Sequence, residues 1–146
     1  MKLETLKKLR NENNLTQKDI AKILNVERST YAGWETEKSI IPVTKLLELS
    51  NYFKINIDYI LGISKKKKYE FISKNIESKV IGENLKRLRI ENNLKQKDII
   101  NNLNISKSTY SLYENGKIIP STNNIYQIIK MYNCSFNELL KKKENG

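Results

Sequence analysis

The sequence predicts an all-α protein that contains the same five-helix unit twice. A shift of 79 positions aligns residues 5–38 with residues 84–117 without a gap, and 19 of the 34 aligned pairs are identical. In both copies, apolar residues recur three or four positions apart, as on the buried face of a helix, and no segment has the pattern of a strand. We therefore divide the chain into domain 1 (residues 1–62), a connector (63–80) and domain 2 (81–146).

Polar residues bound the first two helices of domain 1. Leu6 and Leu9 mark the apolar face of the first helix, which ends near Asn13. Thr16 is a good N-cap for a second helix that begins at Gln17, because a threonine hydroxyl can accept a hydrogen bond from an unpaired N–H of the first turn. The apolar residues expected on the inner face of this helix are Ile20, Ile23 and Leu24.

A sharp turn at Asn25 leads into the third helix, since asparagine tolerates the left-handed conformation. The third helix spans residues 28–35, with Tyr31 and Trp34 one turn apart on its buried face. In domain 2, Ser106 is the expected N-cap of the corresponding helix.

Two further helices complete each domain. Leu46, Leu49 and Phe53 mark the fourth helix of domain 1, and a short fifth helix follows around residues 57–61. In domain 2 the repeat places the single cysteine, Cys134, where a small apolar residue belongs, so we expect it in the core.

Composition excludes several classes of protein. The chain has 27 Lys and Arg against 16 Asp and Glu, a net charge of +11 that suggests a polyanionic partner such as nucleic acid. It has no histidine and one cysteine, and no catalytic, metal-binding or cofactor-binding motif, so we expect neither an enzyme nor a metal or cofactor. No apolar run is long enough to span a membrane and no signal peptide precedes the first helix, which predicts a cytoplasmic protein.

Two helices joined by a tight turn occur in both domains, as QKDIAKILNVERSTYAGWE (17–35) and QKDIINNLNISKSTYSLYE (96–114). Both copies resemble the DNA-binding domains of the lambdoid-phage Cro and repressor family, over about 120 of the 146 residues. The resemblance implies tandem lambda-repressor-like helix-turn-helix domains and a sequence-specific regulator of transcription, most simply a repressor, that binds double-stranded DNA. It also makes a phage or mobile-element origin plausible.

The resemblance implies DNA contacts at the start of the second helix, along the third helix and after it. Gln17 and Gln96 would hold phosphate where the second helix presents unpaired N–H groups. The residues implied to face bases are Arg28, Ser29, Ala32 and Gly33 in domain 1, and Lys107, Ser108, Ser111 and Leu112 in domain 2. The residues implied to lie near phosphates are Thr30, Lys38, Thr109 and Lys117.

These assignments have structural alternatives. Gln17 and Gln96 could simply begin a helix, and Arg28 and Lys107 could be solvated surface charges. Two Arg–Glu combinations suggest a catalytic or phosphate-binding role, but the resemblance implies an internal ion pair between the first and third helices. These combinations are Arg10 with Glu35 and Arg89 with Glu114.

Three residues depart from the family pattern. Glu27 stands where the third helix favours a serine-type cap, Glu37 replaces a loop glycine, and Ile100 replaces a small alanine. Residues 1–62 carry ten basic and eight acidic groups, whereas residues 81–146 carry eleven and six, so we expect domain 2 to bind DNA more strongly through charge alone.

The connector contains four consecutive lysines, followed by apolar residues at helical spacing that suggest an amphipathic helix. These apolar residues are Tyr69, Ile72, Ile76 and Val80. Three interpretations remain open: a linker whose apolar residues lie against a neighbouring domain, a surface for a homodimer or another partner, or a disordered segment.

A different class of function is the alternative. A protein-binding inhibitor or adaptor, encoded by a phage or mobile element, could retain this fold and use its surface against a protein. Glu27 and Leu112 favour this alternative. The residues that favour DNA are Gln17, Gln96, Arg28 and Lys107.

Overall fold

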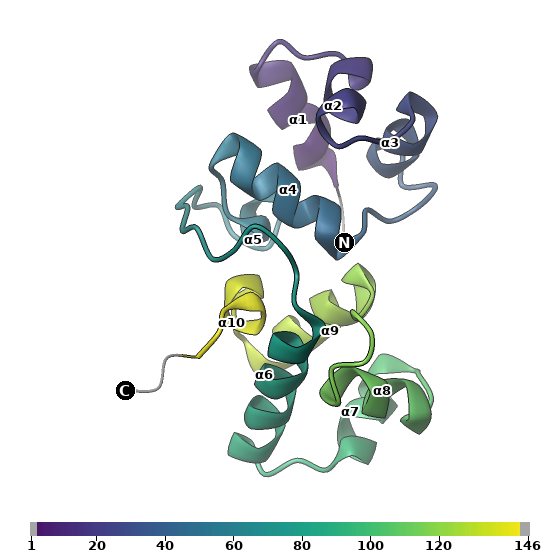
Figure 1. Cartoon of the computed structure of the whole chain (residues 1–146), viewed down its shortest axis with the longest axis vertical. Coiled ribbons are helices and arrows are strands. Elements are labelled where there is room, and N and C mark those ends of the chain that lie inside the picture. The colour runs from purple at the N-terminus through teal and green to yellow at the C-terminus, as the bar shows by residue number, and fades with distance from the viewer. Residues whose placement is uncertain (1–2, 144–146) are drawn as a thin grey trace. The chain divides into compact units, whose positions relative to one another are not determined.

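The computed structural model describes residues 3–143, and the helices in this part of the chain form two compact units (Figure 1). The division falls between Lys74 and Asn75, and we call the two parts unit 1 and unit 2. No strand occurs among the described residues. The predicted all-α fold with two tandem helix-turn-helix domains is confirmed. No helix within residues 3–143 has the length and apolar composition needed to cross a membrane.

Unit 1 contains five helices in the predicted order. They are α1 (Glu4–Glu12), α2 (Gln17–Ile23), α3 (Arg28–Glu35), α4 (Val43–Phe53) and α5 (Ile57–Ile60). Its buried side chains include Leu6, Leu9, Ile20, Leu24, Tyr31, Trp34, Leu46 and Leu49. The prediction was wrong for Ile23, whose side chain is 36% exposed, and Phe53 is only half-buried. The helical periodicity therefore identified the core except at positions near the ends of helices.

The turn between α2 and α3 has the predicted geometry. Asn25 has a φ of 56°, in the left-handed region. Thr16 accepts a hydrogen bond from the Asp19 N–H, and the Asp19 carboxylate accepts one from the Thr16 N–H. Glu27 is the N-cap of α3 without a side-chain capping bond, so this helix begins without the help that Ser106 gives its counterpart.

Unit 2 repeats this order with a longer first helix. Its helices are α6 (Ser78–Glu91), α7 (Gln96–Leu103), α8 (Lys107–Glu114), α9 (Thr122–Tyr132) and α10 (Phe136–Leu140). The first turns of α6 lie against the end of α8, where a Cβ on Gly82 would come within 2.6 Å of the backbone oxygens of Tyr113 and Glu114. Ser78 Oγ donates a hydrogen bond to Gly116 O, 2.8 Å away. These contacts begin before residue 81, where the sequence analysis placed the start of domain 2.

The connector is not an amphipathic helix. Residues 64–77 have no helical conformation, and residues 78–80 form the first turn of α6. Residues 64–74 group with unit 1, and Tyr69 OH donates a hydrogen bond to Asn51 Oδ1 on α4 at 2.8 Å. Tyr69, Ile72 and Ile76 are half-buried. The helical stripe therefore does not form, and residues 64–74 instead lie with unit 1, as in the interpretation of a linker against a neighbouring domain.

Cys134 was expected in the core but is only half-buried. It follows Asn133, the C-cap of α9, whose φ is 53°. The chain leaves the helix at this point and passes near the surface of unit 2.

Candidate nucleic-acid interface

The third helix of each unit buries one face and exposes the other. Tyr31 and Trp34 of α3, and Tyr110 and Tyr113 of α8, are buried. Of the residues that the resemblance places near DNA on these helices and in the loops after them, the exposed ones are Arg28, Ser29, Thr30, Lys38, Lys107, Ser108, Leu112 and Lys117. The half-buried ones are Ala32, Gly33, Thr109 and Ser111. In each unit the side chains implied for DNA thus lie on or border the face opposite the aromatic one.

A buried ion pair ties the third helix to the first in unit 1. Arg10 Nε donates to Glu35 Oε1 at 2.6 Å, and Arg10 NH2 donates to Glu35 Oε2 at 3.3 Å. Arg10 NH1 also donates to Leu15 O at 3.0 Å, so the guanidinium fixes the end of α1 as well as α3. The side chain of Glu35 is only 4% exposed. The internal ion pair that the resemblance implies is therefore present.

Unit 2 contains the same ion pair in almost the same geometry. Arg89 Nε lies 2.6 Å from Glu114 Oε1, and Arg89 NH2 lies 3.2 Å from Glu114 Oε2. Tyr110 OH adds a hydrogen bond to Glu114 Oε1 at 2.9 Å. Both pairs serve the packing of the first helix against the third and lie away from the exposed face of α8 or α3.

Hydrogen bonds keep the two buried carboxylates ionised. Burial raises the pKa of Glu35, but hydrogen bonds from Arg10, Gln17 and Tyr31 outweigh this effect and hold that pKa below its ordinary value. The pKa of Glu114 is lowered in the same way against its burial, by Arg89 and the other donors around it. The pKa of Arg10 is raised, chiefly by its hydrogen bond to Glu35.

Gln17 connects this ion pair to the exposed end of α3. Its Nε2 donates to Glu35 Oε2 at 3.0 Å, and its Oε1 accepts from Arg28 NH1, also at 3.0 Å. The guanidinium of Arg28 is thereby held by a polar chain that reaches the buried Arg10 through Gln17 and Glu35. Gln17 thus does more than begin a helix, and its side-chain amide is already engaged on both sides.

In unit 2 the equivalent glutamine holds a different partner. Gln96 Nε2 donates to Glu114 Oε2 at 3.0 Å, but its Oε1 accepts from Ser111 Oγ at 3.2 Å. Lys107, the counterpart of Arg28, is not part of the hydrogen-bonded network around Gln96. Leu112 is 41% exposed on the same helix, where unit 1 has Gly33. One unit therefore presents a positioned arginine, whereas the other presents a lysine outside the polar chain and an exposed leucine.

The two hydrogen-bonded side-chain networks around Gln17 and Gln96 were not apparent from the sequence motifs. The available signal was that Gln and Glu are separated by 18 residues in both copies, as Gln17 and Glu35 and as Gln96 and Glu114. The resemblance assigns the glutamines to phosphate and the glutamates to arginine, whereas the structure joins each glutamine amide to the glutamate carboxylate of its own unit.

A basic hollow lies between α2 and α3 of unit 1. It has a volume of about 530 Å³ and is lined by Lys18, Ala21, Lys22, Val26, Glu27 and Arg28. Three cations and one carboxylate line it, so it favours an anion despite Glu27. Ala21 lines this space with a small side chain. The corresponding residue in unit 2 is the larger Ile100.

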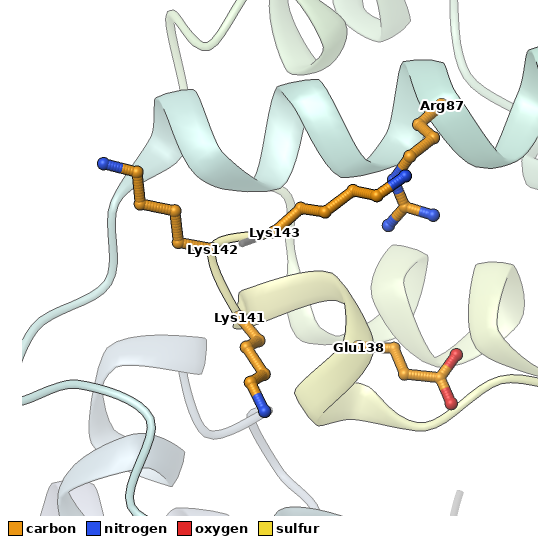
Figure 2. Close-up of a pocket in the computed structure, with 5 residues that line it drawn as sticks. All are labelled: Arg87, Glu138, Lys141, Lys142 and Lys143. Atoms are coloured by element: carbon orange, nitrogen blue, oxygen red, sulfur yellow. The ribbon is translucent and has the colours of Figure 1, made fainter. Parts of the chain in front are cut away.

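A second basic cavity lies in unit 2, away from its third helix. Figure 2 shows Arg87 reaching from α6 and three lysines spreading from the end of α10; with Glu138 they line about 390 Å³. Asn84 fixes this end of the chain, because its Nδ2 donates to Leu139 O and Lys141 O at 2.7 and 2.9 Å. This positive charge belongs to the surface of α6 and α10, and the sequence motifs did not indicate it.

Comparison with known proteins connects both units to helix-turn-helix domains, and about half of the chain to transcriptional regulators. Two family models match the chain, described as "Helix-turn-helix" over residues 6–60 and "Helix-turn-helix domain" over residues 82–145. The uncharacterised HTH-type transcriptional regulator YobD of Bacillus subtilis is 30% identical over 77 residues, which are 53% of this chain and 69% of YobD. The HTH-type transcriptional regulator ImmR of the same organism is 32% identical over 74 residues, covering 49% of this chain and 58% of ImmR. The uncharacterised regulator YqaE, also from B. subtilis, is 31% identical over 74 residues, 50% of this chain and 64% of YqaE. No solved structure matches the chain.

Proposed function

The chain belongs to the helix-turn-helix family of transcriptional regulators, and from this premise we propose that it is a repressor that binds one asymmetric DNA site with both domains. The observation that carries this proposal is the difference between the exposed faces of α3 and α8. Each presents its own set of side chains from the same scaffold, so each should prefer a different half-site. A single chain then supplies both recognition helices.

In unit 1, Arg28 is the residue proposed to recognise a base. Its NH1 is held by Gln17, which leaves other N–H groups of the guanidinium for a guanine edge in the major groove. Gln17 then acts by positioning Arg28, and the unpaired backbone N–H groups at the start of α2 face phosphate. Thr30 and Lys38 are proposed to contact the neighbouring backbone.

In unit 2, the face of α8 proposed to contact bases begins with Lys107 and Ser108 and continues with Ser111 and Leu112. Lysine is a point charge without the planar fork of arginine, so it discriminates bases less sharply. Gln96, Thr109 and Lys117 take the positions equivalent to Gln17, Thr30 and Lys38.

Repression by occupying a promoter needs no ligand, so we propose no cofactor, metal or catalytic step. Action on genomic DNA places the protein in the cytoplasm. Because two DNA-binding units are joined covalently, a homodimer through the connector is not required for binding two half-sites. The named relatives are transcriptional regulators, which favours DNA over an inhibitor or adaptor that binds protein.

Selection of bound duplexes from a random pool tests this proposal. We expect one enriched site with two unlike half-sites, bound by one chain, and a log K for random duplex that falls steeply with log salt. Arg28→Ala should relax the preference at one base pair, whereas Arg87→Ala, on α6, should leave the selected sequence unchanged. Failure to enrich any duplex would refute DNA recognition, and an enriched palindrome bound by two chains would refute the asymmetric site.

A further inference from the structure

The chain that follows α5 is anchored to unit 1 by side chains of α4 and the α5 cap. Asn56 Nδ2 donates to Lys66 O and Lys68 O at 2.7 and 2.6 Å. Asn51 Nδ2 donates to Ser73 O at 3.0 Å. These bonds hold backbone carbonyls at three points along the connector, which lies against α4 and α5 (Figure 1).

Aromatic and ionic contacts add to this anchoring. Tyr69 OH donates to Asn51 Oδ1 at 2.8 Å, and the Lys54 ammonium lies 5.3 Å from the centre of the Tyr69 ring. Lys67 Nζ lies 5.3 Å from the centre of the Tyr59 ring and 3.7 Å from Glu12 Oε2. We call Asn51, Asn56 and Tyr69 the connector anchor, because their side chains make the hydrogen bonds.

Anchoring shortens the chain that links the two units. Unit 1 holds the chain as far as Ser73, and unit 2 holds Ser78 through its bond to Gly116 O. Backbone bonds from the Ile63 and Ser64 N–H groups to Asp58 O hold the start of the connector independently of the anchor. The five residue steps from Ser73 to Ser78 span at most about 18 Å, whereas the fourteen steps from Ser64 to Ser78 span at most about 50 Å. The difference, about 32 Å, is close to the ~34 Å of one helical turn of DNA.

We infer that the connector anchor sets the spacing between the two half-sites that one chain can bind. With the anchor formed, the short link restricts binding to a narrow range of spacings. With the anchor released, the same two units reach half-sites one helical turn farther apart. This inference rests on the proposed binding of two half-sites, and it assigns Asn51, Asn56 and Tyr69 a positioning role outside the DNA-contacting surface.

Three nearly isosteric substitutions release the anchor. Asn51→Asp and Asn56→Asp remove the amide donors and place a carboxylate against backbone oxygens, while Asn56→Asp keeps the oxygen that caps α5 at the Tyr59 N–H. Tyr69→Phe removes the hydroxyl. The matched control is Lys7→Gln with Asn11→Asp, at exposed positions of α1. This pair of substitutions makes the net charge more negative by two, as the two Asn→Asp substitutions do.

Binding is measured on duplexes that carry the selected half-sites at their selected spacing, or with 5 or 10 inserted base pairs. For the parent and the control, 10 inserted base pairs should weaken binding about 100-fold, because simultaneous contact is lost. The released variant, which carries all three substitutions, should lose less than about 10-fold in affinity with 10 inserted base pairs, relative to its own affinity at the selected spacing. At the selected spacing the released variant should bind roughly 5-fold more weakly than the parent, because effective concentration falls as about the −3/2 power of linker length. For the released variant, 5 inserted base pairs should weaken binding more than 10, because they turn one half-site to the opposite face of the duplex; the parent and the control lose simultaneous contact with either insertion.

Trypsin cleavage without DNA gives an independent measurement of the anchor. Cleavage within Lys65–Lys68 should be slow in the parent and control and at least 10-fold faster in the released variant. Equal cleavage rates would show that the anchor does not hold the connector, and equal spacing profiles would show that it does not set spacing; either result overturns the inference. If no protein gains affinity from a second half-site, the proposed bivalent function fails and the inference fails with it. The trypsin result then still reports whether the anchor forms.

Discussion

Removal of the Glu35 carboxylate should destabilise unit 1 strongly. In Glu35→Ala the guanidinium of Arg10, whose side chain is 13% exposed, loses both of its bonds to the carboxylate, although its bond to Leu15 O remains. Gln17 loses its acceptor at the same time. Breaking one side of a buried pair costs about 3 to 5 kcal/mol, because a charge is left without its partner in a poorly solvated place.

That loss is large for so small a unit. Domains have about 0.05 to 0.15 kcal/mol of stability per residue, so unit 1 should have about 4 to 11 kcal/mol in total. A loss of 3 kcal/mol lowers the melting temperature of a domain of this size by about 12 °C or more. Glu48→Ala is the control, since Glu48 is 46% exposed and pairs only with Lys45 on the surface. That change should cost less than about 1 kcal/mol.

The single tryptophan allows unit 1 to be followed alone. Trp34 is 4% exposed in the core of unit 1, so its fluorescence reports unfolding of this unit within the full chain. Glu35→Ala should move this transition to lower temperature, whereas Glu114→Ala should leave it in place and move the unit 2 transition seen by circular dichroism. A Glu35→Ala protein that melts within 2 °C of the parent by Trp34 fluorescence but no longer binds DNA would refute the structural role of this pair and make the carboxylate functional.

Three further predictions follow from the same geometry. Hydrogen bonds lower the folded-state pKa of Glu35 and Glu114. The stabilisation by these carboxylates is therefore complete above the unfolded-state pKa of about 4.3 and is lost as pH falls through the lower folded-state pKa values. Melting curves recorded at decreasing pH should show both units losing stability below about pH 4. Gly82→Ala should destabilise unit 2 by about 1 to 3 kcal/mol, because the new Cβ meets backbone atoms that cannot turn aside; an unchanged unit 2 transition in circular dichroism would contradict the close packing of α6 on α8. Arg28→Ala and Lys107→Ala should each weaken specific binding by about 1 to 3 kcal/mol if the side chain reads a base, whereas an equal loss on all duplexes in filter binding would identify a phosphate contact.

The repeated scaffold was predictable because local signals along the chain specify it. Apolar residues at helical spacing placed Leu6, Leu9, Tyr31 and Trp34 in the core, and the structure buries all four. Asn25 was identified from its tolerance of the left-handed conformation. Such features depend on a residue and its close neighbours, so one sequence is sufficient to find them.

The connector was not predictable in the same way. Its apolar spacing is compatible with a helix, but Tyr69 lies 18 residues from Asn51, and Asn56 reaches carbonyls 10 and 12 residues away. A partner that satisfies backbone carbonyls at this separation appears only when α4 and α5 have folded. The same applies to the first turns of α6, where Gly82 permits a close approach to α8 that no local signal in the sequence indicated.

Local patterns along the chain are enough to predict two helix-turn-helix domains, the positions of their helices and the residues that are candidates for DNA contact. Tertiary structure decided how those candidates are held: Gln17 lies 11 residues from Arg28 and Gln96 lies 15 residues from Ser111, so identical glutamines in matching positions hold different partners. Periodicity specifies which face of a helix is buried. It does not specify which polar groups meet across helices, because that depends on side-chain length and on distances that exist only after the helices have packed.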